Sequence, residues 1–230
     1  MSNKNIESQD KTLENIESTL SKTEQFIEKN QNKILYILGG IILVVALYWA
    51  FVRFYQTPRN VEADTQIFVA QQHFAADSFA LALNGNVSTL GFLGIIDDYS
   101  GTKAANLAHF YAGICYLNLK DYDNAFNQIK KFRTTDILLA SEKYGILGDI
   151  CVEQDKLDEA IKWYNKATKE NYSNNFSTPI YLKKLGLVYE KLNKFAEAQK
   201  VYETIFYKYP QSNEARTIEK YIERAKLGVK

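Results

Sequence analysis

The run GLVYEKLNKFAEAQKVY at residues 186–202 decides the fold, because the chain holds two earlier copies of it. These copies are GICYLNLKDYDNAFNQI at 113–129 and GDICVEQDKLDEAIKWY at 148–164. The opening glycines lie 35 and then 38 residues apart, and twelve residues after each of them stands an alanine: Ala125, Ala160 and Ala198. A repeat of this length is typical of solenoids, in which each copy is one supersecondary unit stacked on the next. The sequence therefore predicts an all-α solenoid of antiparallel helix pairs.

The recurring small residues let paired helices approach closely. Glycine inside a helix costs up to about 1 kcal/mol relative to alanine, so we expect it where a neighbouring helix needs the space. The recurring alanine has the same role on the second helix. A short polar turn separates the two helices of each pair, and we predict that one residue of each turn caps the second helix: Asp121, Asp155 and Asn193.

This pattern resembles the tetratricopeptide repeat over roughly residues 106–210, and most closely in the third copy. The residues of that copy at the family's Leu-Gly, Tyr, Ala, Phe and Pro positions are Leu185-Gly186, Tyr189, Ala198, Tyr202 and Pro210. The earlier copies depart from the pattern, because Cys151 replaces the first-helix tyrosine and Phe132 stands where a small residue is usual. The resemblance implies three degenerate repeats over 102–211 and a function in protein–protein interaction.

Helical segments flank the repeats on both sides. We predict an irregular helical capping region over 56–101 and a C-terminal capping helix over 212–230. Solenoids need such caps because a terminal repeat otherwise exposes its apolar side. Thr102 is the expected N-cap of the first repeat helix, and Thr178-Pro179 is the expected start of the third pair.

An uncharged stretch, ILYILGGIILVVALYWAFV, occupies Ile34 to Val52. At about 1.5 Å of helical rise per residue it spans roughly 28 Å, close to the hydrocarbon thickness of a bilayer. Lys33 and Arg53 flank it, and aromatic residues gather at its ends, as at membrane–water interfaces. We therefore predict a transmembrane helix over 34–55.

A cleaved signal peptide and a buried soluble helix are the alternatives for this stretch. A long polar tail precedes it and the residues after it are a poor cleavage site, which disfavours a signal peptide. A soluble helix usually keeps a polar stripe, which is missing here.

More lysines precede the span than arginines follow it, which favours a cytoplasmic N-terminus. The repeats would then lie in the periplasm of a bacterium, single-pass anchored to the inner membrane.

Residues 1–33 form a polar tail with apolar residues at seven-residue intervals: Ile6, Leu13, Leu20 and Ile27. Ile16 adds one further position to this heptad seam. So few heptads make a marginal isolated helix. A short amphipathic docking helix and a mostly solvated tail both remain open.

Composition and motifs disfavour several function classes. Net charge is +1, with 28 Lys and Arg against 27 Asp and Glu, so there is no basic excess for nucleic acid. Cys115 and Cys151 lie in apolar helical runs and are expected to be buried free thiols. His73 and His109 have no partner at metal-ligand spacing, and the common catalytic and phosphate-binding motifs are missing. We expect no enzyme activity, no cofactor, no metal and no small-molecule substrate.

The layout of polar tail, single span and degenerate repeats is similar to that of the YfgM family, an ancillary subunit of the bacterial SecYEG translocon. The stretches EQFIEKNQ before the span, and ALALNG and GFLGIIDDYSGTKAANLAHFYAG after it, carry the likeness, and the latter two resemble repeat proteins of Bacteroidetes. The resemblance implies a periplasmic interaction scaffold in translocation or chaperone networks, with translocon subunits, chaperones or emerging chains as partners. The alternative is a structural, self-associating protein of the envelope, such as an adaptor for cell division or outer-membrane assembly.

In tetratricopeptide domains, ligands usually meet exposed positions on the first helix of each pair. Carried onto this sequence, these candidate partner-binding residues are Ile114, Leu117 and Asn118, then Asp149, Val152 and Glu153, then Lys183, Leu187 and Glu190. The first set is largely apolar, the second acidic and the third mixed, which suits a partner segment with apolar and basic groups. Leu107 and Phe110 share this face, but we expect such large apolar side chains to pack against the upstream helices.

Overall fold

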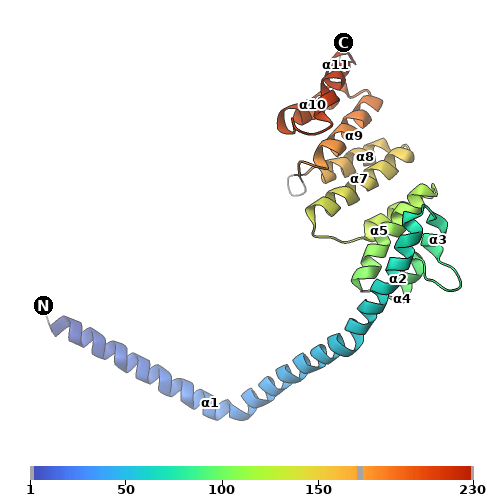
Figure 1. Cartoon of the computed structure of the whole chain (residues 1–230). Coiled ribbons are helices and arrows are strands. Elements are labelled where there is room, and N and C mark those ends of the chain that lie inside the picture. The colour runs from blue at the N-terminus through green and yellow to red at the C-terminus, as the bar shows by residue number, and fades with distance from the viewer. Residues whose placement is uncertain (1–2, 170–172, 229–230) are drawn as a thin grey trace. The chain divides into compact units, whose positions relative to one another are not determined.

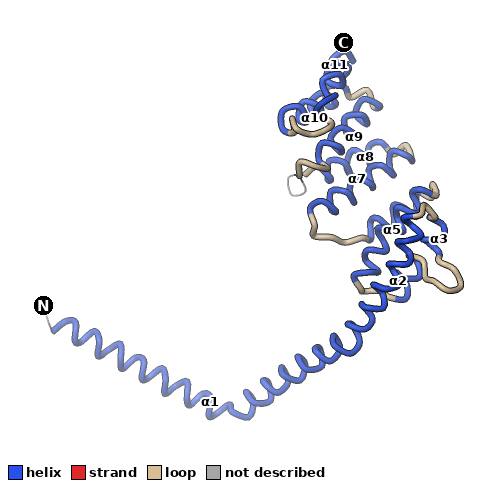
Figure 2. Tube along the Cα trace, in the orientation of Figure 1, coloured by secondary structure: helices blue, strands red, loops and turns tan. Residues whose placement is uncertain are grey.

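The computed structural model describes residues 3–169 and 173–228, with side chains from Phe26 onward except Glu28. All elements in these residues are helical, and a single isolated bridge joins Gly85 to Leu90 (Figure 2). The predicted all-α class is therefore confirmed for this part of the chain. The chain divides into two units, Met1–Pro58 and Arg59–Lys230.

The first unit is one long helix. Helix α1 spans Asn3–Phe51 and runs directly into a π-helical turn, η1, at Val52–Gln56. The polar tail and the apolar stretch thus form one continuous helix. At the expected boundary between residues 33 and 34 the residue types change, but the backbone stays helical. The side chains of the heptad residues Ile6, Leu13, Ile16 and Leu20 lie outside the described part.

Apolar side chains along the second half of α1 have no protein cover among the described residues. Leu35, Ile42 and Trp49 are each more than 60% exposed, and nothing in the most apolar 18-residue window is buried. Such a surface is stable only in an apolar solvent or against another apolar surface. The helix is long and apolar enough to cross a membrane, although a signal sequence meets the same criterion.

The second unit consists of short helices that follow one another along the chain (Figure 1). They are α2 (Thr57–Ala75), α3 (Phe79–Asn84), α4 (Phe92–Asp98), α5 (Lys103–Asn118), α6 (Tyr122–Lys131), α7 (Ile137–Glu153), α8 (Leu157–Ala167), α9 (Thr178–Lys191), α10 (Phe195–Lys208), a 3₁₀ turn η3 (Ala215–Thr217) and α11 (Ile218–Gly228). The main contacts are within the pairs α5/α6, α7/α8 and α9/α10, and between each pair and the next. Three helix pairs thus lie where the three sequence copies predict them.

The recurring small residues lie where paired helices touch. A Cβ added to Gly148 would come within 2.6 Å of the Tyr164 ring, and one added to Gly186 within 2.2 Å of the Tyr202 ring. Ala160 and the other two repeat alanines are fully buried. The close approach predicted from the glycine and alanine spacing is confirmed, and each buried tyrosine ring fills the space that its glycine leaves.

The predicted helix starts are partly right. Thr102 accepts a hydrogen bond from the Ala105 N–H at the start of α5, and Asp121 caps α6 in the same way through Asn124 N–H. Asp155 and Asn193 do not cap the second helices.

They adopt a left-handed backbone, with φ of 57° at both residues, one position before the actual N-cap residues Lys156 and Lys194. Aspartate and asparagine tolerate this conformation better than most residues. Aspartate and asparagine are thus suited to these positions because the backbone is left-handed where the first helix ends, and not because they cap the second helix.

Both ends of the repeat stack are covered by helices. Upstream, Ala63 and Ile67 of α2 and Phe92 and Ile95 of α4 share one core with the small residues of α5. Downstream, Ile218 and Ile222 of α11 share a core with Ala198, Tyr202 and Ile205 of α10. In this way α11 keeps the apolar face of the last repeat from water.

Candidate functional site

A groove of about 640 Å³ runs across the first helices of the three pairs, α5, α7 and α9. Its lining residues come from these helices, from the turn after α5 and from α6 and α8: Leu117, Asn118, Lys120, Tyr122, Asp149, Val152, Glu153, Tyr164, Lys184, Leu187, Val188 and Lys191. The groove exists because stacked pairs place equivalent helices side by side, so that the same face of each contributes to one surface.

The floor of the groove is apolar and partly open to solvent. Leu117 of α5 and Val152 of α7 are half-buried, and Leu187 of α9 is 40% exposed. Leu117 and Val152 occupy matching positions, four residues after the repeat glycines of α5 and α7, whereas Leu187 directly follows the repeat glycine of α9. An apolar side chain from a partner would bury area here without displacing a protein contact.

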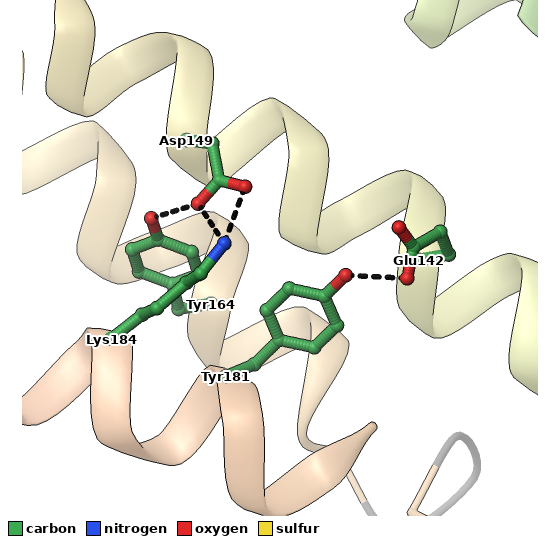
Figure 3. A network of polar contacts seen from close by, with 5 residues as sticks. All are labelled: Glu142, Asp149, Tyr164, Tyr181 and Lys184. Atoms are coloured by element: carbon green, nitrogen blue, oxygen red, sulfur yellow. Dashed lines mark hydrogen bonds and ion pairs between the residues drawn. The ribbon is translucent and has the colours of Figure 1, made fainter. Parts of the chain in front are cut away.

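A polar network forms one wall of the groove (Figure 3). Asp149 of α7 accepts a 2.6 Å hydrogen bond from the Tyr164 hydroxyl of α8, and the Nζ atom of Lys184 on α9 lies 2.8 Å and 2.6 Å from its two carboxylate oxygens. One carboxylate thus joins three helices from two repeats. Burial and the neighbouring Asp149 carboxylate raise the pKa of Tyr164 far above its ordinary value.

This network makes the α7 side of the groove less acidic than the sequence indicates. The carboxylate of Asp149 is already compensated by Lys184, and Glu153 accepts a hydrogen bond from the Tyr122 hydroxyl at 3.2 Å. The groove is therefore not the acidic surface that residue types alone suggest. A basic partner segment has less to gain here than an apolar one.

A second tyrosine contact closes part of the same face (Figure 3). Tyr181 of α9 lies over Gly145 of α7, so closely that a Cβ there would come within 1.9 Å of the ring. Its hydroxyl donates a 2.7 Å hydrogen bond to the Glu142 carboxylate. Burial, and then this carboxylate, raise the pKa of Tyr181 well above its usual range. Gly145 and Glu142 are thus used between repeats and do not face a ligand.

Six of the nine candidate partner-binding residues line the groove: Leu117, Asn118, Asp149, Val152, Glu153 and Leu187. The other three lie elsewhere. Ile114 packs against the core between the first and second pairs. Lys183 lies over the Tyr221 ring of α11 at 5.0 Å from its centroid, and Glu190 pairs with Arg224 of α11. Their faces are covered by the next helix in the stack, which helical position alone does not reveal.

The sequence prediction missed several lining residues, chiefly Lys120, Tyr122, Tyr164, Lys184 and Val188. Lys184 lies three residues before Leu187, and Val188 lies four residues after Lys184, so an i, i+3, i+4 count along α9 finds both. Lys120 and Tyr122 lie in and after the turn, and first-helix positions cannot predict them.

The expectation for the two large apolar residues of α5 is half right. Leu107 packs against the core formed with α2 and α4, as predicted. Phe110 instead packs towards the second pair, with its ring 5.2 Å from that of Phe132. The prediction for Phe110 is therefore wrong in direction.

Both cysteines are buried free thiols, as the sequence indicates. Burial raises the pKa of Cys115 to about 12 and that of Cys151 to about 11, which keeps them protonated and unreactive. Among the described residues, no group of three or more His, Cys, Asp or Glu side chains could hold a metal ion.

Comparison with known proteins agrees with this geometry. Sequence profiles of the tetratricopeptide repeat match residues 144–174 and 184–212, which contain most of α7/α8 and α9/α10. The chain therefore carries tetratricopeptide repeats, and proteins of this class act as protein–protein interaction scaffolds. No curated protein matches the chain significantly in sequence.

Two solved structures of MamA are similar to the chain. The first is 20% identical, with a TM-score of 0.46, and the match covers 72% of this chain and 91% of that one. The second is 24% identical, with a TM-score of 0.40 and coverage of 60% and 88%.

Proposed function

We propose that the groove across α5, α7 and α9 binds a segment of a partner protein, and that Ile34–Val52 anchors this scaffold in a membrane. The observation that carries the proposal is the apolar floor formed by Leu117, Val152 and Leu187, because these side chains come from three successive repeats and are partly exposed. A surface built in this way fits an extended or helical segment laid across the repeats.

The partner segment we propose presents apolar side chains to the floor and polar groups to the rim. Lys120, Lys191 and Glu153 on the rim supply both signs of charge. Because Asp149 already has its cation, the floor attracts its ligand chiefly by apolar burial. The sequence indicates a partner segment with apolar and basic groups, and the proposal gives the apolar groups the greater part of the binding free energy.

We extend the proposal to a periplasmic scaffold of the inner membrane that assists protein translocation or chaperones. Its support is the resemblance to the YfgM family and the excess of lysine before the span. Translocon subunits, chaperones and emerging chains are the partners that this resemblance implies.

Photocrosslinking in cells tests the groove. A photoreactive amino acid is placed in the full chain at Leu117 or Leu187, and as matched controls at Lys162 of α8 or Lys200 of α10, which are exposed and do not line the groove. We expect the same crosslinked polypeptides from both groove positions and none of them from the controls. Equal adducts from all four positions, or none from the groove, would contradict the proposed binding face.

Membrane anchoring has a separate test. We expect the full chain to resist alkaline extraction from membranes and to keep the N-terminal tail, as read from the intact mass of the purified protein. A mature protein that begins after residue 55 would show a cleaved signal sequence. Reporter fusions on either side of the span then determine the topology, and a cytoplasmic repeat unit would overturn the periplasmic proposal.

A further inference from the structure

A second hollow, of about 740 Å³, lies between the start of α5 and the end of α6, away from the groove. Four exposed cationic side chains line it: Lys103, Lys130, Lys131 and Arg133. No aspartate or glutamate is among its lining residues, and in the described part of the chain none of the four cations is in an ion pair. In a chain of net charge +1, this is a local positive surface without internal compensation.

Side-chain hydrogen bonds fix the backbone of the segment that carries Lys130 and Arg133. Asn106 of α5 accepts a 2.9 Å hydrogen bond from the Arg133 N–H and donates a 2.8 Å bond to its carbonyl. Lys143 of α7 donates to the carbonyls of Lys130 and Phe132. Burial, and then the positive charges of Lys166 and Arg133, lower the pKa of Lys143, as expected beside a concentration of cations. The hollow is thus a fixed feature of the α5/α6 pair.

The first residue of the repeat unit, Arg59, is bonded beside this hollow. Arg59, at the start of α2, donates a 2.7 Å hydrogen bond to the Asp98 carbonyl, and Ser100 two residues later is on the rim of the hollow. Arg59 follows Tyr55, the end of the predicted span, by four residues, so their Cα atoms are at most about 14 Å apart even in a fully extended chain. Only this short length of chain connects the end of the predicted span to Arg59.

We infer that this basic hollow binds the headgroups of anionic phospholipids in the membrane that holds the anchor. The inference rests on the anchoring part of the proposed function. Basic groups near an anionic surface attract it over about a Debye length, which is about 8–10 Å at ordinary ionic strength. The proposed headgroup site and the groove across α5, α7 and α9 have no lining residue in common, so both can be occupied at once.

Lysine footprinting tests the inference on the full chain. The protein is reconstituted in vesicles of phosphatidylcholine alone, or of equal parts phosphatidylcholine and phosphatidylglycerol, and amine acylation is followed by mass spectrometry. We expect acylation of Lys103, Lys130 and Lys131 to slow about fivefold in the anionic vesicles. Lys162 and Lys200 are exposed on other helices and serve as internal controls that should not change.

Paired variants separate the hollow from general charge. In K130Q/K131Q the protection of Lys103 should be lost, whereas the charge-matched K162Q/K200Q should retain it. All four lysines are exposed, so neither variant disturbs the core. Protection that is equal in both vesicle types, or that persists in K130Q/K131Q, would overturn the inference.

Two further outcomes are distinguished by the same experiment. If inorganic phosphate or a short RNA protects these lysines equally in phosphatidylcholine vesicles, the hollow is a site for soluble anions and the lipid assignment is wrong. If the chain does not float with vesicles of either composition, anchoring itself fails, and the inference fails with it. If the chain floats with the vesicles but its lysines are not selectively protected, headgroup binding by the hollow is contradicted and membrane anchoring is not.

Discussion

At single positions in the repeats, the distance between two paired helices determines which residue type fits. Gly186 and Tyr202 show this most clearly, because the ring lies where any side chain on residue 186 would be. Tyr202 is fully buried, so its ring has no free space into which it can move. Gly148 and Gly186 thus each mark the position of a tyrosine ring, whereas the neighbour of Gly113 is Ile129.

Gly186→Ala should destabilise the protein by about 2 kcal/mol, because the new methyl group would overpack a fixed ring. Chemical denaturation of the full chain in detergent measures this change. The matched variant is Gly94→Ala, where the nearest atom is the flexible end of Leu90 at 3.0 Å. Because alanine favours a helix more than glycine does, this variant should have little effect or be slightly stabilised, and an equal loss in both variants would contradict overpacking as the cause.

The buried tyrosines make stability sensitive to alkaline pH. The folded-state pKa of Tyr164 is raised by burial and by Asp149, so folding is favoured while the phenol is protonated in both states. As pH rises above about 10, the unfolded phenol loses its proton first, and stability falls by up to about 1.4 kcal/mol per pH unit from this group.

Tyr164→Phe removes this titration and should make the free energy of unfolding depend less on pH between 10 and 11, although it lowers stability at pH 8 because the Asp149 bond is lost. Urea unfolding at pH 8, 10 and 11 gives the comparison. Tyr207→Phe, at an exposed position, is the control and should leave the slope unchanged. The same slope in Tyr164→Phe and in the unaltered protein would show that this phenol does not contribute.

At the scale of elements, each helix begins and ends through local backbone chemistry. Asp121 and Asp155 occupy adjacent positions of equivalent turns, one as an N-cap and the other in a left-handed conformation. The residue type is the same, so type alone predicts the same role for both. Only the backbone angles separate them.

Asp155→Gly should leave stability unchanged or raise it by up to about 1 kcal/mol, since glycine adopts φ of 57° without strain. The exposed ion pair with Lys191 that is lost contributes little. Asp121→Ala should lower stability by about 1 kcal/mol because the Asn124 N–H loses its acceptor. Thermal unfolding compares the two, and a loss in Asp155→Gly as large as in Asp121→Ala would favour a capping role for Asp155.

At the scale of the whole molecule, the two units differ in the surroundings in which their surfaces are stable. The unit Arg59–Lys230 has its own buried cores, whereas the second half of α1 exposes its apolar side chains. The helical caps α2–α4 and α11 complete the repeat unit at both ends. This unit should therefore fold without the anchor.

The fragment 57–230 is expected to be soluble without detergent, strongly helical and cooperative in unfolding, while the full chain needs detergent or lipid. Circular dichroism and sedimentation velocity measure these properties. Under the proposed scaffold function we expect a monomer at all concentrations. Concentration-dependent assembly of the fragment would instead favour the self-associating envelope protein, the alternative indicated by the sequence.

The sequence by itself determined the class of fold, the positions of the three helix pairs and the apolar stretch, because these depend on periodicity and on runs of residue type. It also indicated most of the groove, since Leu117, Val152 and Leu187 all lie at first-helix positions where ligands of tetratricopeptide domains usually bind. Only the tertiary structure decided which positions of that face stay open. Tyr181 covers Gly145, and α11 takes up Lys183 and Glu190. The compensation of Asp149 by Lys184 likewise depends on the rotation of one repeat against the next, which side-chain packing sets and helical spacing does not contain.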